Sequence, residues 1–223
     1  MYKRQVVECL LDLNFVVDSS GSIEYKGAGN WNKTLAFVVE VINQFTIGPN
    51  DVNVAFVLFS DVATVEWGLT RYTNKAELVS AVRGMRYISA TTNLNDALFL
   101  TRTEVFARAR SNAKKATVIL TDGEDNVPEV GTPLTIQNAT ACKNAGIRLI
   151  AVGISDAVDR DRLLQIVSSS SDYHAVDDFD ALPSVVAELQ PSQICFPTPS
   201  TPAPPSTKHR GIICLHITQL QCF

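Results

Sequence analysis

Short runs of apolar residues alternate along the chain with stretches in which apolar residues recur every three or four positions. Continuous apolar runs bounded by polar residues predict strands, and apolar residues at helical spacing predict amphipathic helices. The predicted strands cover residues 11–17, 52–59, 63–67, 117–120, 147–152 and 172–176. The predicted helices cover residues 31–46, 74–84, 95–109, 133–145, 159–168 and 178–189.

Several of these strands are continuously apolar rather than alternating. Continuous apolar strands are buried on both faces, as in parallel sheets that are covered by helices. Helices of about 10–15 residues between successive strands indicate repeated βαβ units with right-handed crossovers. The pattern therefore predicts an open, doubly wound α/β sheet with helices on both faces.

Polar residues stand directly after two of the predicted strands. Asp18, Ser20 and Ser22 follow the first strand, and Asp122 follows the strand at 117–120. Ligands of open α/β sheets bind outside the carboxyl ends of the strands, where the strand order reverses. If these two strands flank that point, the four side chains lie together and form an all-oxygen set. Such a set suits Mg²⁺, Mn²⁺ or Ca²⁺ and disfavours zinc and copper.

The same short stretches also have a simpler interpretation. Asp and Ser are common in turns and at the amino ends of helices, so residues 18–22 could cap the helix that follows. Asp122-Gly123 is typical of a tight turn, and Thr92 of a helix N-cap. Only the occurrence of all these residues in one chain, at the ends of neighbouring strands, favours a metal site.

Asp18-x-Ser20-x-Ser22 is the first of an ordered series of short motifs. The others are Phe59-Ser60-Asp61, Tyr72-Thr73-Asn74-Lys75 with Leu78, Tyr87, Thr92-Asn93, Thr121-Asp122-Gly123 and Ala151-Val152-Gly153-Ile154. In this order they resemble the von Willebrand factor A domain family, and the resemblance covers about residues 9–195. Asp18-x-Ser20-x-Ser22 then matches the metal-ion-dependent adhesion site of that family.

The resemblance implies a role for each candidate residue. Ser20 and Ser22 are expected as direct hydroxyl ligands, and Thr92 as the hydroxyl ligand of the open, high-affinity state. Asp18 and Asp122 are expected to act mostly through bound water. The implied cation is Mg²⁺, with Mn²⁺ or Ca²⁺ as alternatives. The implied fold is a six-stranded, mostly parallel sheet with one short antiparallel edge strand.

Three features depart from the family pattern. Ser89-Ala90 stands where a Gly-Gly pair is usual, and Leu94 and Asn95 replace the usual second threonine and glycine. The loop after Ser22 is a few residues longer than usual and contains residues 24–27. None of these changes removes a ligand, so we expect them to affect loop mobility and the choice of partner.

The cysteines have no spacing typical of a zinc site. Within the family fold, Cys9 and Cys195 flank the domain on the side opposite the metal, which implies a disulfide between them. Cys142 is expected to pack inside its helix, and the pairing of Cys214 and Cys222 stays open.

Several features indicate an extracellular protein. Asn32 and Asn138 begin acceptor triplets for N-glycosylation. Residues 197–207 are rich in Pro, Thr and Ser, a composition typical of extended, O-glycosylated segments. We expect an N-terminal extension at 1–8, the domain at 9–195, a linker at 196–207 and an unassigned tail at 208–223.

Charge and hydropathy argue against a nucleic-acid-binding or membrane-spanning protein. The net charge of −4 does not favour nucleic acid or an anionic membrane surface. No run of about 18 apolar residues predicts a membrane span. Residues 1–5 lack the apolar stretch of a signal peptide, so we expect a fragment of a longer secreted or cell-surface protein.

The sequence thus predicts a non-enzymatic adhesion or matrix-binding module. Its partner would be an extracellular protein, with collagens and other matrix proteins as the expected class, which supplies an Asp or Glu to the bound cation. One alternative is a structural assembly domain in which the metal is incidental. A more remote one is a Mg²⁺-dependent phosphoryl-transfer enzyme, but position 20 is Ser rather than a second carboxylate and no GxxxxGK[ST] loop is present.

Overall fold

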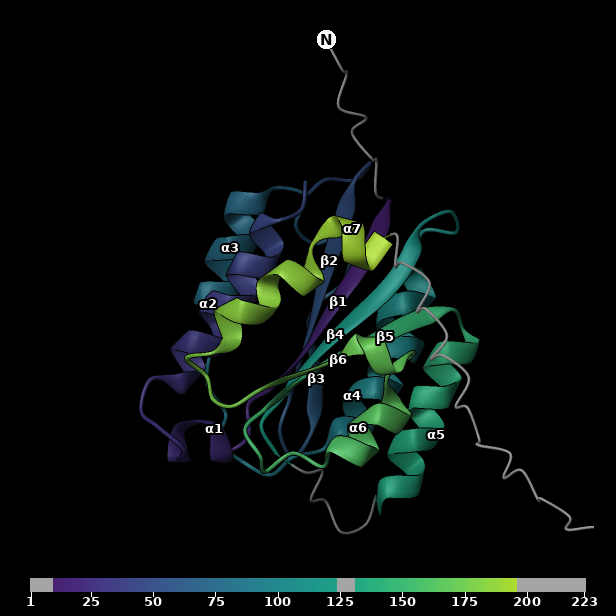
Figure 1. The fold of residues 1–223 in the computed structure, drawn as a ribbon. Helices are drawn as coiled ribbons and strands as arrows, with labels where there is room; N and C mark the ends of the chain where they lie inside the picture. The colour runs from purple at the N-terminus through teal and green to yellow at the C-terminus, as the bar shows by residue number, and fades with distance from the viewer. Residues whose placement is uncertain (1–9, 124–130, 196–223) are drawn as a thin grey trace, which may run out of the picture.

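The computed structural model describes residues 10–123 and 131–195, which fold around one six-stranded sheet (Figure 1). The strand order is β3-β2-β1-β4-β5-β6, and all neighbours are parallel except β2 and β3. This confirms the predicted fold class. The strands are β1 (Leu11–Asp18), β2 (Val52–Phe59), β3 (Ala63–Trp67), β4 (Lys114–Thr121), β5 (Ile147–Ile154) and β6 (Tyr173–Val176).

Helices cover both faces of the sheet. In Figure 1, α2 and α3 lie on one side, and α4, α5 and α6 lie on the other. The α-helices are α1 (Ser22–Tyr25), α2 (Asn30–Asn43), α3 (Lys75–Arg83), α4 (Leu94–Leu100), α5 (Gly131–Asn144), α6 (Arg160–Ile166) and α7 (Pro191–Cys195). Within the part of the chain that the structure describes, no helix is long and apolar enough to cross a membrane.

Two predicted helices differ from the structure. The helix predicted at 95–109 ends as α4 at Leu100 and continues as a π-helical turn over Thr101–Val105 and a 3-10 helix over Phe106–Arg108. The π-helical turn sets the buried Thr101 hydroxyl 3.0 Å from the Asn14 amide of β1, and the hydroxyl accepts its hydrogen bond. In segments this short, apolar periodicity does not distinguish these helix types, so the change could not be predicted.

The α-helix predicted at 178–189 is replaced by a turn and a 3-10 helix. Residues 178–181 form a turn, because the Asp178 carboxylate accepts hydrogen bonds from the backbone N–H groups of Asp180 and Ala181. Leu182–Leu189 is a 3-10 helix, and α7 begins only at Pro191. Proline has no N–H to donate, so it fits the first turn of a helix and not its interior.

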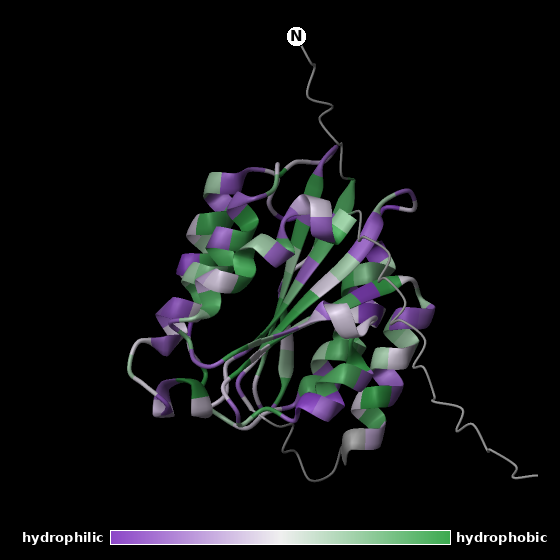
Figure 2. Cartoon of the chain, in the orientation of Figure 1, coloured by the Kyte–Doolittle hydropathy of each residue, from purple (hydrophilic) through white to green (hydrophobic). Residues whose placement is uncertain are grey.

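The apolar side chains form two cores, one on each face of the sheet. Alternate residues of β1, β2, β4 and β5 face α2, α3 and the 3-10 helix Leu182–Leu189. The intervening residues face α4, α5 and α6. Figure 2 shows the resulting pattern, with apolar residues along the strands and on the inward sides of the helices. The cores hold the sheet rigid, so the loops at its edges start from fixed points.

A buried ion pair anchors the amino end of β1. Asp12 is fully buried, and its carboxylate accepts from the backbone N–H and the Nε of Arg110 at 2.7 and 2.8 Å. The same guanidinium donates to the carbonyl oxygens of Pro49 and Leu11. Arg110 therefore ties the chain before β4 to β1 and to the turn before β2.

We expect Asp12→Ala to lower the free energy of unfolding by about 3–5 kcal/mol, because it leaves the Arg110 guanidinium without its buried partner. The matched control is Lys33→Ala, which removes a 2.8 Å ion pair to Asp180 on the surface. That change should cost less than about 1 kcal/mol. Urea unfolding of both variants measures the difference, and equal losses would contradict the role given to Asp12.

Candidate metal site

The two candidate carboxylates meet because β1 and β4 are adjacent and parallel. Val17 pairs with Leu120 in this register, so both strands end at the same edge of the sheet. The strand order also reverses between β1 and β4, since β1 pairs with β2 on its other side. The Thr121 hydroxyl donates to Asp18 Oδ2 at 2.7 Å across this junction, and the Ser20 N–H donates to Oδ1 at 2.8 Å.

Ser20, Ser22 and Asp122 form a chain of oxygen atoms beside Asp18. The hydroxyl oxygens of Ser20 and Ser22 are 3.0 Å apart. Ser22 in turn donates to Asp122 Oδ1 at 2.7 Å. Four of the five candidate residues thus converge from the loops after β1 and β4, as the sequence predicted.

Burial changes the acidity of this cluster. Asp18 and Asp122 are almost completely buried. Burial, together with the nearby Asp122 carboxylate, raises the pKa of Asp18 from 3.8 to about 6, although hydrogen bonds from Ser20 and Thr121 act in the opposite direction. An ionised Asp18 is therefore costly unless a cation lies close to it.

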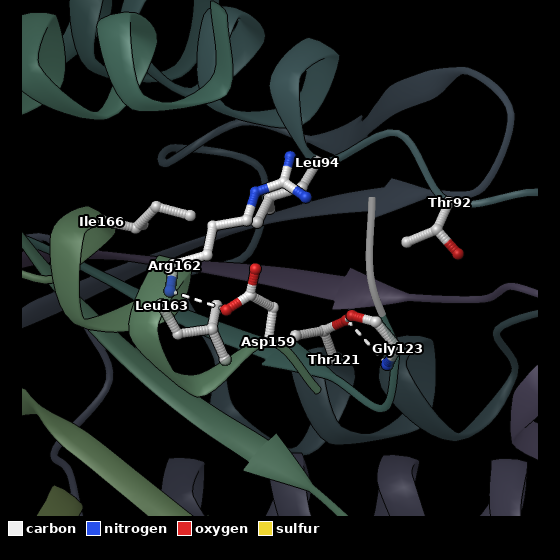
Figure 3. Close-up of a pocket in the computed structure, with 8 residues that line it drawn as sticks. All are labelled: Thr92, Leu94, Thr121, Gly123, Asp159, Arg162, Leu163 and Ile166. Atoms are coloured by element: carbon white, nitrogen blue, oxygen red, sulfur yellow. Dashed lines mark hydrogen bonds between the residues drawn. The ribbon is translucent and has the colours of Figure 1, made fainter. Parts of the chain in front are cut away.

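Thr92, the fifth candidate, is buried on a loop that attaches directly to the loop after β1. Ala90 pairs with Ser20 in a parallel bridge and accepts a hydrogen bond from the Gly21 N–H at 2.9 Å. Thr92 also lines a small cavity together with Thr121 and Gly123, and Figure 3 shows its side chain across this cavity from Arg162. Three separate loops therefore border the site.

Ser89 shows why the family usually has glycine in this loop. Its φ of 64° lies in the left-handed region, which L-residues other than Gly, Asn and Asp seldom adopt. The conformation is held by the Ser89 N–H, which donates to the Ser19 carbonyl at 2.9 Å, and by the Ser19 hydroxyl, which accepts from Ile88. Ser89 thus adopts a strained backbone conformation that these hydrogen bonds stabilise.

Other polar groups, to which the sequence analysis assigned no role, hold the site in place. Tyr87 donates its hydroxyl proton to the Ser20 carbonyl at 2.6 Å. The Ser60 hydroxyl, at the end of β2, donates to the Thr91 carbonyl and accepts from the Ala90 N–H. Thr121 orients Asp18, as described above. All three belong to the quoted motifs, and a hydroxyl directly after a buried strand is the signal that could have found Ser60 and Thr121.

Lys26 brings a positive charge to this cluster. Its Nζ lies 3.0 Å from Asp122 Oδ2 and also donates to the Asp122 carbonyl. A further hydrogen bond of 3.1 Å reaches the hydroxyl of Ser155, directly after β5. Lys26 thus contacts the Asp122 oxygen that Ser22 does not use.

The residues at this edge fit a hard divalent cation. Asp122 Oδ2 is buried, and although Lys26 lies close to it, it accepts no well-formed hydrogen bond from any described residue. The described residues contain no group of three or more His, Cys, Asp or Glu side chains placed to hold a metal. The donor set at this edge consists of two carboxylates and the neighbouring hydroxyls. This set matches the chemistry of Mg²⁺, Mn²⁺ and Ca²⁺.

The remaining candidate residues are the cysteines and the two asparagines of the glycosylation triplets. Cys195 is disulfide-bonded, but Cys9 lies outside the described residues, as do the predicted linker and tail. Cys142 is buried, as expected, and burial raises the pKa of its thiol to about 11. Asn32 is exposed on α2, whereas the Asn138 amide donates to Asn95 at 2.8 Å between α5 and α4.

Fold and site together define a doubly wound α/β domain with a hydroxyl and carboxylate cluster at the carboxyl edge of its sheet. The chain belongs to the von Willebrand factor type A domain family, whose model matches residues 12–188. This confirms the resemblance that the sequence motifs indicated.

Related proteins come from extracellular matrix. Mouse (Mus musculus) vitrin is 29% identical over 179 residues, which are 80% of this chain and 26% of vitrin. The human (Homo sapiens) collagen alpha-6(VI) chain is 28% identical over 82% of this chain and 8% of its own length. The chain thus spans about a quarter or less of these relatives. They are secreted, non-enzymatic matrix proteins, in agreement with the predicted extracellular location and non-enzymatic class.

A solved structure of similar fold is that of proximal thread matrix protein 1 from the mussel byssus. It has a TM-score of 0.75 and 28% identity, and the match covers 82% of this chain and 46% of that one. The structure of that protein was determined with zinc in its metal-ion-dependent adhesion site (MIDAS) motif. A divalent metal can therefore occupy the corresponding motif of a related domain.

We expect Asp18→Asn to stabilise the domain in the presence of a chelator, and more so at high pH. Because the pKa of Asp18 is raised in the folded state, the wild-type domain loses stability as pH rises toward about 6, where this carboxyl ionises. Asparagine keeps the shape and has no charge to bury. The stability difference between variant and wild type should grow by about 1 kcal/mol between pH 5 and pH 8. Urea unfolding at the two pH values measures it; a difference independent of pH would refute the assignment.

Proposed function

We propose that this domain is an extracellular adhesion or matrix-binding module that holds Mg²⁺ at the carboxyl edge of its sheet and binds an acidic residue of a partner protein there. The observation that carries the proposal is the convergence of Ser20, Ser22 and Asp122 on one another, with Asp18 buried beneath them.

Each residue has a distinct part in the proposal. The hydroxyls of Ser20 and Ser22 would ligate the cation directly, with Thr92 from the neighbouring loop. Asp18 and Asp122 would supply negative charge, and their buried positions keep that charge from being screened by water. When bound, Mg²⁺ supplies a positive charge that hydroxyl ligands leave largely unneutralised, and a partner's carboxylate is attracted to it.

The proposed cation follows from the donor set, and the proposed partner class follows from the related proteins. The all-oxygen donor set favours Mg²⁺ over zinc, with Mn²⁺ or Ca²⁺ as substitutes, although the related byssus domain was determined with zinc. The partner class proposed is matrix protein, collagen above all, because relatives of this chain include vitrin and collagen chains.

The direct test is binding of the purified chain to immobilised matrix proteins, collagens first, in Mg²⁺ and in chelator. We expect binding only in Mg²⁺, and its loss in Asp122→Asn, which preserves shape but removes charge. Asp180→Asn is the matched control, because Asp180 carries the same charge but lies on the surface, where it forms an ion pair with Lys33. Full binding by Asp122→Asn in chelator would refute the metal bridge. Self-association that persists in chelator would instead favour the assembly alternative.

We also propose that the domain spans residues 9–195 and is closed by a Cys9–Cys195 disulfide. The neighbourhood supports this pairing, since the Lys114 N–H donates to the Leu10 carbonyl at 3.0 Å while its ammonium donates to the Cys195 carbonyl. Lys114, at the start of β4, thus contacts the chain at both ends of the domain. These contacts lie at the edge of the sheet opposite Asp18.

Cys9→Ser should therefore lower the free energy of unfolding by roughly 3–5 kcal/mol, because the bond closes a long loop. Cys195→Ser should have the same effect, and the double variant should lose no more than either single one. Chemical denaturation with and without reductant measures these changes. Losses that add in the double variant would show that the two cysteines are not bonded to each other.

A further inference from the structure

We infer that Lys26 is a built-in counter-ion of Asp122 that competes with the divalent cation and so sets the cation concentration at which the site fills. This inference rests on the proposed function, since it concerns the same site. Lys26 belongs to the longer loop after Ser22, which contains none of the proposed metal ligands.

The backbone of this loop fixes where Lys26 stands. The short helix α1 ends there, with the Lys26 N–H donating to the Ser22 carbonyl at 3.0 Å. The Glu24 carboxylate then closes the loop, accepting from the N–H groups of Gly29 and Trp31 at 2.8 and 2.7 Å. Gly29 has a φ of 86°, a conformation that favours glycine and turns the chain into α2. Lys26 is therefore held four residues from a metal ligand by a closed loop.

From that position the ammonium group joins three loops at the sheet edge. It contacts both the carboxylate and the carbonyl of Asp122 after β4, and the Ser155 hydroxyl after β5. Ser155 has a φ of 74° and its hydroxyl also accepts from the Ala157 N–H at 3.3 Å. The ammonium thus donates two hydrogen bonds, to the Asp122 carbonyl and the Ser155 hydroxyl, and its contact with Asp122 Oδ2 is an ion pair.

The positive charge of Lys26 affects how strongly Asp122 attracts a divalent cation. Asp122 is completely buried, while the Lys26 side chain is 27% exposed. A positive charge 3.0 Å from Oδ2 neutralises much of the charge with which Asp122 would attract a divalent cation. The cation must overcome this repulsion or displace the ammonium, so Lys26 weakens cation binding. Once bound, the cation keeps more of its positive charge for the carboxylate of a partner.

Lys33 provides a matched control for this effect. It lines the same groove as Lys26, next to Ser155 and Asp180, and carries the same charge. Its ammonium pairs with the exposed Asp180 and not with Asp122. Lys33→Gln therefore removes one positive charge from the same region without touching the site.

The experiment measures Mg²⁺ and Mn²⁺ dissociation constants of the full 223-residue chain by titration calorimetry, at constant ionic strength. We expect Lys26→Gln to bind both ions roughly tenfold more tightly than wild type. Lys33→Gln and the charge-retaining Lys26→Arg should stay within about threefold of wild type. In chelator, Lys26→Gln should melt a few degrees lower than wild type, because Asp122 loses its partner. A purely structural lysine would predict lower stability without tighter metal binding.

The outcomes separate this inference from the proposed function. Wild-type binding with unchanged or weaker affinity in Lys26→Gln overturns the inference and leaves the metal site intact. An equal gain in Lys26→Gln and Lys33→Gln also overturns it, since general charge removal then explains the effect. Failure of both wild type and Lys26→Gln to bind either ion at millimolar concentrations overturns the inference and the proposed function together.

Discussion

Every property of this edge of the molecule depends on the parallel pairing of β1 with β4. That pairing brings two carboxylates, Asp18 and Asp122, into a buried region where their charges repel each other strongly. The fold compensates with donors placed around them, namely the Ser20 N–H, the hydroxyls of Thr121 and Ser22, and the Lys26 ammonium. The cluster is therefore stable as a protein structure and still attracts further positive charge.

The rigidity of the site comes from contacts between loops rather than from the ligands themselves. Tyr87 and Ser60 connect the loop that carries Thr92 to the ends of β1 and β2. Ser89 keeps a left-handed backbone within this loop without the usual glycine. Because such strain persists only where neighbouring groups determine the conformation, this loop has less freedom than a Gly-Gly loop would have.

Apolar periodicity predicted the doubly wound sheet and its strands, and the polar residues after two of these strands made Asp18, Ser20, Ser22 and Asp122 candidates. Their meeting was predicted only on the condition that the two strands are neighbours, which the pairing of β1 with β4 fulfils. The sequence did not predict the π-helical turn after Leu100 or the 3-10 helix that ends at Leu189, since both segments are too short to show a distinct apolar period. It noted Lys26 only as part of a longer loop. No sequence pattern shows where a long, flexible side chain will lie, and its contact with Asp122 appears only in three dimensions.

The contacts of Lys114 have a consequence for how the domain is displayed. Because this residue contacts both Leu10 and Cys195, the polypeptide enters and leaves the fold at one pole. Asp18 is the last residue of β1 and therefore lies at the opposite pole. Any neighbouring module would be attached at that first pole. The cluster of Asp18, Ser20, Ser22 and Asp122 lies at the other pole, so a module attached in this way would not cover it.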